Sequence, residues 1–359
     1  MAKTLLRVHR WLSLFLLLFW LLHALTGVLI TFRWELDDFF LGGEPKPFNL
    51  QAFSSRIQAI EADPGFEVGS VWASGGHADR YDLFLSLRDG GSAKMRIDGS
   101  GSILRTRAED QWFTAGGIYD NATTLHANLF AGDLGHWLVA LSGSLLLSNL
   151  ILGLCVAWPR RGQWRRSLTT PPAGSGTARI YGWHRLLGLW LAWPAMLVVL
   201  FGSLLALSDP LGESLGWKSP QPDLSNPAQF QSDWHTAAVT PADAIAAALA
   251  LYPGAEFSGM YPPDEEEPWY TVRLLTSDEP QQVYGKTAVV VSPVSGEVLA
   301  NQPAVEYPVA RRLTYSLFPL HTGQIIGLPG RLIGLLSGLF LVTMIVLGAC
   351  LYWKRRGRS

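Results

Sequence analysis

The chain has 359 residues, of which 48% are hydrophobic and only 16% are charged. Soluble globular proteins have about 25% charged residues, so this composition indicates a membrane protein. The formal net charge of −1 argues against a nucleic-acid partner, and the two cysteines, which both lie in apolar runs, exclude a disulfide scaffold.

Four stretches without charged residues predict four transmembrane helices, because each reaches the roughly 20 residues that a helix needs to cross a bilayer. The first stretch is longer than a typical signal-peptide core, and no small-residue cleavage site follows it. We therefore expect it to remain as a membrane anchor. The uncharged stretches are residues 11–32, 137–158, 186–208 and 332–353. The predicted transmembrane segments are 1–34, 126–160, 184–208 and 321–359, the last with a C-terminal tail.

Two long segments, 35–125 and 209–320, connect these helices and show the same order of predicted elements. The first contains "FSSRIQAIEADPG", typical of a helix, and then "RYDLFLSLRDG" and "SAKMRIDGSGSILR", typical of strands. The second contains "TPADAIAAALALYPG", a helix capped by Thr240, and then "WYTVRLL", "KTAVVVSP" and "GEVLA". Each segment is predicted to form a small α+β domain.

The distribution of Lys and Arg predicts the orientation, since short basic segments favour the cytoplasmic side of a membrane. Basic residues cluster before the first helix, in the 161–183 loop and its flanks, and after the fourth helix. Both termini and this loop are therefore expected in the cytoplasm, and the two long segments on the opposite side.

An internal repeat is suggested by two constant offsets in numbering. Adding 195 relates residues of the second and fourth helices, and adding 175 relates residues of the first and third. Both halves start on the same side, so the repeats are predicted to be parallel. The matches include His126 with His321, Gly135 with Gly330, Cys155 with Cys350, His9 with His184, and Gly27 with Gly202.

These motifs resemble those of the PepSY-associated transmembrane proteins. The resemblance rests on "HRWLSL", "LHANLFAGDLGHWL", "WHRLLGLW" and "LHTGQIIGLPGRL", and on turns that match the end of a PepSY module. One such turn keeps Asp98, whereas the other has Ser292 where Asp is usual. The resemblance implies a multi-pass protein of the bacterial inner membrane with two periplasmic PepSY-like domains. Some members resemble ferrisiderophore reductases with non-covalent haem.

Histidines at the membrane helices are the candidate ligands of a cofactor, because ionisable residues there are costly. The offsets pair His9 with His184 at the cytoplasmic ends and His126 with His321 at the outer ends. Facing imidazoles in a helix bundle are typical of bis-histidine b-type haem, so two haems are predicted. The alternative is that each histidine merely lies in the interfacial zone. A bare metal is disfavoured, since zinc needs three or four ligands.

Other histidines have competing interpretations. His23 follows His9 by fourteen residues, which on one continuous helix places both on nearly the same face, about 21 Å apart. It is therefore a rival ligand for the outer haem, although its counterpart in the repeat is Val198. His136 is interpreted as a polar interface residue. His77 and His235 are interpreted as surface residues.

Arg10 and Arg185, which directly follow the cytoplasmic-end histidines, are candidate partners for haem propionates, because guanidinium binds carboxylate in a bidentate manner. The alternative is that these two arginines are basic residues that set the orientation of the helices in the membrane. Arg33 and Arg331 mark the outer helix ends. Cys155 and Cys350 are interpreted as small apolar fillers. No Cys-x-x-Cys-His motif for covalent haem and no nucleotide-binding motif occurs, so the electron donor is predicted to be a quinol or a cytoplasmic reductase.

The sequence thus predicts a transmembrane oxidoreductase that uses two b-type haems to reduce a periplasmic ferric siderophore, with no catalytic residue separate from the haem. Two other classes stay open. The chain could be a non-enzymatic PepSY binding or regulatory protein of the envelope, or a transporter subunit.

Overall fold

The computed structural model describes residues 2–44, 46–75, 79–88, 90–108, 110–114, 116–214, 238–280 and 283–356. The chain divides into two compact units. We call the first the membrane unit; it takes in residues 1–31, 122–216 and 317–359. We call the second the sheet unit; it takes in residues 32–121 and 217–316.

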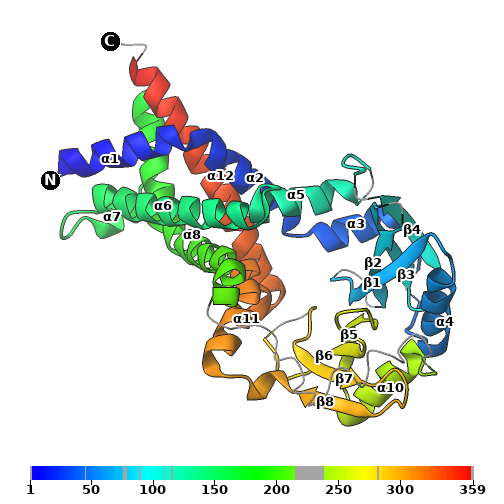
Figure 1. Ribbon diagram of the computed structural model, residues 1–359. Helices are drawn as coiled ribbons and strands as arrows, with labels where there is room; N and C mark the ends of the chain where they lie inside the picture. Colours follow the sequence, from blue (N-terminus) through cyan, green and yellow to red (C-terminus); the bar gives the residue numbers. More distant parts are fainter. Residues whose placement is uncertain are drawn as a thin grey trace. The chain divides into compact units, whose positions relative to one another are not determined.

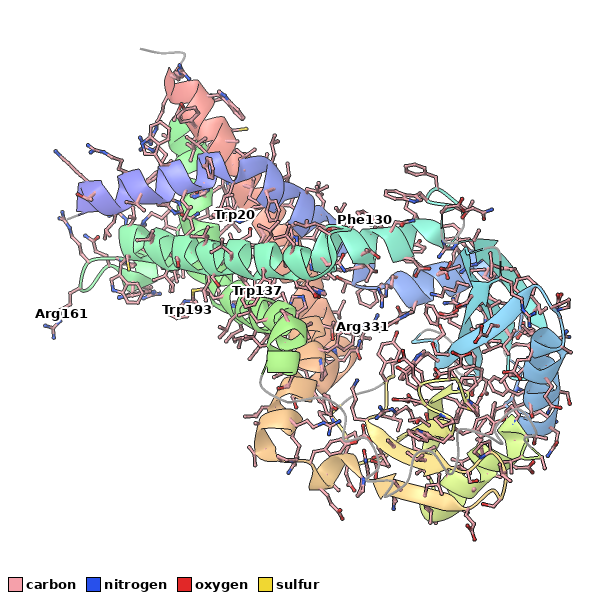
Figure 2. The ribbon with its side chains drawn as sticks, viewed as in Figure 1. Trp20, Phe130, Trp137, Arg161, Trp193 and Arg331 are labelled. Atoms are coloured by element: carbon pink, nitrogen blue, oxygen red, sulfur yellow. The ribbon has the colours of Figure 1, made fainter. Side chains whose placement is uncertain are left out.

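The membrane unit is built from apolar helices (Figure 1). Three of them are long and apolar enough to span a membrane, namely α6 (Gly132–Ala157), α8 (Thr177–Ser214, apolar to Ser208) and α12 (Leu328–Arg356). Many of their large apolar side chains are exposed, including the labelled Trp137 and Trp193 in Figure 2, as expected of surfaces that face lipid. The short helix α7 (Trp164–Thr169) lies between α6 and α8.

The first predicted transmembrane segment is not one straight helix. It consists of α1 (Ala2–Phe15) and α2 (Leu17–Ile30), bent by 68° at the break. In the last turn of α1 the Ser13 hydroxyl donates to the carbonyl oxygen of His9, a bond that often bends helices. The prediction that His9 and His23 share one face of a continuous helix is therefore wrong. Counting the bent pair as one span gives up to four spans.

The second and fourth predicted segments also begin differently from expectation. His126 lies on α5 (Gly117–Asn128), and His321 lies on α11 (Val309–Thr322), so both are on helices that end before the spanning helices begin. The chain turns tightly at each break, because a Cβ on Gly135 would overlap the backbone carbonyl of Asn128, seven residues earlier. A Cβ on Gly330 would likewise overlap the carbonyl of Gly323.

These breaks explain why a glycine stands nine residues after each of these two histidines. In an unbroken helix, residues seven apart are about 10 Å from each other, so close contact requires the turn. The break after α5 passes through Leu129 and Phe130, which both have positive φ (57° and 58°), and the break before α12 contains the short helix η3 (Gln324–Ile326).

The sheet unit contains one antiparallel sheet of eight strands in the order β4-β3-β2-β1-β5-β6-β7-β8. Each half has a helix followed by four strands; the sequence predicted the order, helix then strands, but not the number of strands. The first half consists of α4 (Leu50–Glu61), β1 (Phe66–Ala73), β2 (Arg80–Leu87), β3 (Ser92–Asp98) and β4 (Ile103–Ala108). The second consists of α10 (Pro241–Leu251), β5 (Glu256–Tyr261), β6 (Tyr270–Leu275), β7 (Thr287–Val291) and β8 (Val298–Gln302).

The two halves join edge to edge, which the sequence did not indicate. Strand β1 pairs with β5, with Val71 opposite Met260 and Trp72 opposite Gly259. One hydrophobic core includes buried residues of both halves, and α4 and α10 pack against each other on the same face of the sheet (Figure 1). The predicted cap of α10 is present, since Thr240 and Asp243 form a capping box. The short helix η2 (Ala304–Glu306) follows β8.

A buried network of charged residues connects α3 (Arg33–Leu41) to the first half of the sheet. Arg96 on β3 donates to the carboxylates of Asp37, Asp38 and Asp82 at 2.7–3.0 Å. Arg80 pairs with Asp38, and Arg105 pairs with Asp37. All three aspartates are less than 10% exposed, so the network fixes α3 on the sheet.

Candidate functional site

The predicted histidine pairs come together in the membrane unit. His9 on α1 and His184 on α8 have ring centroids 6.4 Å apart. His126 on α5 and His321 on α11 have ring centroids 6.2 Å apart. All four side chains are partly buried, and each keeps some accessible surface.

These two separations match those of two imidazoles that bind one metal ion from opposite sides. A metal–imidazole bond is about 2 Å long and the bonded nitrogen lies roughly 1 Å from the ring centroid, so the expected centroid separation is roughly 6 Å. A metal site made only of protein side chains would need three or four ligands in place of two. Within the described ranges, no group of three or more His, Cys, Asp or Glu side chains is placed to hold a metal ion.

Hydrogen bonds define the ring tautomer of three of the four histidines. In each case Nδ1 lies within hydrogen-bonding distance of a backbone carbonyl oxygen of a neighbouring helix, and a carbonyl only accepts, so Nδ1 carries the proton. The unprotonated Nε2 is then the nitrogen that can bind a metal. The bonds are His9 to Asn149 at 3.1 Å, His126 to His23 at 3.1 Å, and His321 to Val198 at 2.9 Å.

A glycine lies four residues after each acceptor carbonyl, and this glycine contacts the same imidazole ring. A Cβ at Gly202 would stand 2.6 Å from Cε1 of His321, and one at Gly27 would stand 3.0 Å from Cε1 of His126. Gly153 has the same relation to His9, at 3.1 Å. The fourth glycine, Gly348, is looser, because its Cβ would be 3.6 Å from Cε1 of His184. The glycines therefore make room for the histidine rings at the helix surface.

Replacing these glycines by alanine should have graded effects on stability. Gly202→Ala places a methyl group against the His321 ring and should destabilise the membrane unit by about 1–3 kcal/mol, the usual cost of overpacking. Gly348→Ala meets only an ordinary contact, so the better helix propensity of alanine should leave stability unchanged or slightly higher. Thermal unfolding of the two variants in detergent measures the difference. Equal melting temperatures would contradict this account of the glycines.

Two further glycines of the membrane helices, Gly143 and Gly338, have different neighbours. A Cβ at Gly143 would overlap the Ser203 hydroxyl, and one at Gly338 would stand 2.8 Å from Val28. These two positions therefore serve close packing between helices and do not contact the histidines.

His23 lies beside the His126/His321 pair, but in a different geometry. Its ring stacks on that of His126, with centroids 4.0 Å apart and an angle of 22° between the planes. The His23 ring also stacks on the ring of Phe19, with centroids 5.9 Å apart. Rings stacked at 4.0 Å are too close to hold one iron between them, so this geometry favours His321 as the partner of His126.

The candidate arginines have structural contacts of their own. Arg185 donates to the carbonyl of Ala157, the last residue of α6, and to the Ser167 hydroxyl. Arg331, labelled in Figure 2, donates to the carbonyl of Thr31 at the end of α2. Arg33 lies over the ring of Trp34. Arg10 is exposed on α1, one residue after His9.

The remaining residues singled out by the sequence contribute less to this site. Cys155 is exposed on α6 and Cys350 is partly buried on α12, and both are free thiols. His136 lies near the start of α6, partly buried. His77 and His235 lie outside the described residues.

Sequence reasoning missed two polar residues beside His9, Ser13 and Asn149. Asn149 lies on α6, is 5% exposed, and donates from Nδ2 to the Ser13 hydroxyl at 2.8 Å. A buried asparagine in an apolar helix is costly without partners, and this was the signal available in the sequence.

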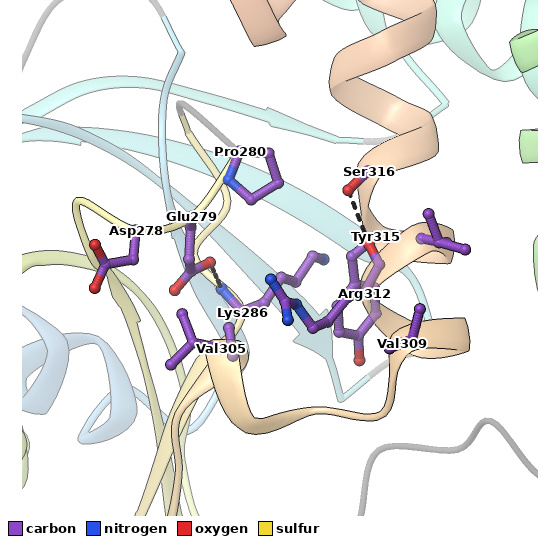
Figure 3. Close-up of a pocket in the computed structure, with 11 residues that line it drawn as sticks. Asp278, Glu279, Pro280, Lys286, Val305, Val309, Arg312, Tyr315 and Ser316 are labelled. Atoms are coloured by element: carbon purple, nitrogen blue, oxygen red, sulfur yellow. Dashed lines mark hydrogen bonds between the residues drawn. The ribbon is translucent and has the colours of Figure 1, made fainter.

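The sheet unit has a cavity of about 290 Å³ that contains none of the predicted site residues (Figure 3). Its polar side chains include Glu279, Lys286 and Arg312. The Glu279 carboxylate already accepts from the backbone N–H groups of Lys286 and Thr287 and from the Thr287 hydroxyl, so it shapes the loop.

The fold and the histidine pairs define a class of protein, a membrane helix bundle with paired imidazoles attached to an α+β sheet unit. The family model for the PepSY-associated TM region matches residues 6–355, almost the whole chain. The protein therefore belongs to this family, as the sequence motifs indicated. A comparison with curated proteins finds no match.

Proposed function

We propose that this protein binds two b-type haems, one between His9 and His184 and one between His126 and His321, and transfers electrons across the membrane. The observation that carries the proposal is the spacing of the two pairs, 6.4 Å and 6.2 Å between ring centroids. Both fit two imidazoles on opposite sides of one iron, as estimated above from metal–imidazole bond lengths.

The residues around each pair suit haem iron. Three of the four rings donate from Nδ1 to a backbone carbonyl, which orients the ring and raises the basicity of Nε2. The neighbouring glycines leave the rings room at the helix surface. When bound, haem supplies one-electron transfer. Arg10, exposed beside His9, is available for a propionate.

The orientation is part of the proposal and rests on the basic residues. Lys and Arg gather at both termini and between α6 and α8, which favours the cytoplasmic side for those parts and the periplasm for the sheet unit. Arg161, in the turn after α6, is one of these residues (Figure 2). The proposed donor on the cytoplasmic side is a quinol or a reductase.

The proposed substrate is a ferric siderophore, by the family resemblance. One electron from the donor reduces its Fe(III) to Fe(II), which hard oxygen ligands hold less tightly, and iron is released. No other group of the chain is needed to break or form a covalent bond in this reaction.

We expect the purified protein to contain about two non-covalent haems per chain with low-spin bis-histidine spectra. After chemical reduction, adding a ferric siderophore should reoxidise the protein rapidly, and Fe(II) should appear in a chromogenic trap. A reduced-minus-oxidised difference spectrum, haem extraction and stopped-flow absorbance provide the measurements. Ferric chelate added to oxidised protein is the control and should yield no Fe(II).

Two outcomes separate the parts of this proposal. A folded protein that binds no haem would favour an envelope binding or regulatory protein, or a transporter subunit. A protein that binds two haems but stays reduced with every ferric chelate, and reacts instead with a quinone or a disulfide, would keep the haem assignment and exclude the siderophore.

A further inference from the structure

We propose that Ser13 and Asn149 are positioning residues that hold His9 in one orientation and one tautomer, whereas His184 lacks such support. The His9/His184 pair would then consist of one fixed ligand and one adjustable ligand. This inference rests on the proposed function for its consequence at the haem, but its structural part is testable without haem.

Three hydrogen bonds form a closed ring that connects α1 to α6. His9 donates from Nδ1 to the carbonyl of Asn149 at 3.1 Å. The Ser13 hydroxyl donates to the carbonyl of His9 at 2.7 Å, and Asn149 Nδ2 donates to that hydroxyl at 2.8 Å. Because Asn149 is buried, water competes poorly for these bonds. The ring therefore fixes both the imidazole and the backbone of His9.

The corresponding positions around His184 are apolar. The offset of 175 relates Ser13 to Gly188, and the offset of 195 relates Asn149 to Met344. These two are in contact, since a Cβ on Gly188 would stand 3.3 Å from Cε of Met344. Nδ1 of His184 is buried and, among the described residues, has no hydrogen-bond partner. The same polar support is thus present on one side of the pair and missing on the other.

The difference matters for metal binding, because loss of an outer partner that orients a ligating histidine typically costs about 10–100-fold in metal affinity. His9 is oriented before a metal binds, whereas His184 must become ordered when it binds. An added molecule that competes for the iron should therefore displace His184 before it displaces His9.

The first test exchanges the surroundings of the two histidines in the full-length protein. Ser13→Gly with Asn149→Met gives His9 the residues found around His184. The backbone carbonyl of residue 149 remains, but the side-chain bonds that hold it against His9 are lost, so haem binding at this pair should weaken about 10–100-fold while the His126/His321 haem is retained. Gly188→Ser with Met344→Asn places the corresponding hydroxyl and amide beside His184, which should hold its Nδ1 against the carbonyl of residue 344 and strengthen binding. Haem titration followed by absorbance measures both. Ser148→Ala, an exposed hydroxyl beside Asn149 that bonds only within α6, is the matched control and should change nothing.

The second test measures the ring directly in the haem-free protein. With ¹⁵N-labelled histidine, NMR should show His9 as a single tautomer protonated at Nδ1, and as a mixture of tautomers after Ser13→Gly with Asn149→Met. A mixture already present in the unmodified protein would overturn the proposal. The proposal would also be overturned if the Ser13→Gly with Asn149→Met variant lost the single His9 tautomer but bound haem with unaltered affinity. If the protein takes up no haem at all, the proposed function fails, and the NMR result still decides whether Ser13 and Asn149 position His9.

Discussion

His184→Ala should remove the haem of the His9/His184 pair and leave the other haem in place, and His321→Ala should do the reverse. The two pairs are far apart along α8, because His184 and Gly202, the glycine that contacts His321, are 18 residues apart on that helix. At 1.5 Å per residue this is about 27 Å. Loss of one axial ligand should therefore leave the distant pair unperturbed.

Haem extraction and low-temperature difference spectra of the variants measure this separation, and each variant should retain about one haem per chain. His136→Ala is the control, since His136 belongs to neither pair, and should retain both. His23→Ala should keep the haem at His126/His321. The ring centroids of His23 and His126 are 4.0 Å apart, which is too close for the two rings to bind one iron between them. Loss of that haem in His23→Ala but not in His126→Ala would refute the assignment of the pair.

The membrane class, the family and the helix-then-strands order of each outer segment could be predicted from the sequence. Hydropathy over about 20 residues is a strong signal, and so are paired motifs at a constant offset. The offsets also selected the histidines that come together, because two residues at equivalent ends of related helices meet across a bundle. Whether the two halves are a true repeat stays a prediction.

The breaks in the helices could not be predicted from local sequence. The bend at Leu16 falls within an uninterrupted apolar run, and the break after α5 uses Leu129 and Phe130, residues that rarely adopt positive φ. A particular contact accompanies each break, and neither contact can be read from the local pattern. At the first, Ser13 bonds to Asn149 on another helix; at the second, Gly135 packs against Asn128. This is why a spacing argument based on one continuous helix was wrong for His9 and His23.

The joining of the two halves through β1 and β5 was equally hidden, because strand pairing between distant segments leaves no local pattern. The charged network beneath α3 did leave one. Charged residues alternate along β2 and β3, with Arg80 and Asp82 on one strand and Lys94 and Arg96 on the next. A period of two places such residues on one face of a sheet, where cross-strand pairs form.

The second large effect is expected in this network. Arg96→Met should lower the free energy of unfolding of the sheet unit by up to about 3–5 kcal/mol, because Arg96 is the cation that contacts all three buried carboxylates, and each of them then keeps fewer donors. The Arg96 side chain is 4% exposed, and it contacts Asp37, Asp38 and Asp82. The methionine fills similar volume, so the loss reports on charge and hydrogen bonding more than on packing.

The stability of the same variant should depend less on pH in the acid range. Burial alone would raise the pKa of Asp82, but Lys94 and Arg96 outweigh it and hold this pKa below its ordinary value. A group with a lowered pKa in the folded state stabilises the protein above its unfolded pKa of about 4, and this stability is lost as pH falls through the folded value. Without Arg96 the folded pKa should rise toward the ordinary one, so the pH-dependent part of the stability shrinks.

Pulse proteolysis of the full-length protein in urea, with detergent present, measures the stability of the sheet unit at neutral and acidic pH. Lys46→Met is the control. It removes an ion pair with Asp98 in which the lysine side chain is 53% exposed, and such pairs contribute about 0–1 kcal/mol. An Arg96→Met protein as stable as Lys46→Met would mean that the network adds little to stability. The attachment of α3 to the sheet would then depend on its remaining contacts rather than on its two aspartates.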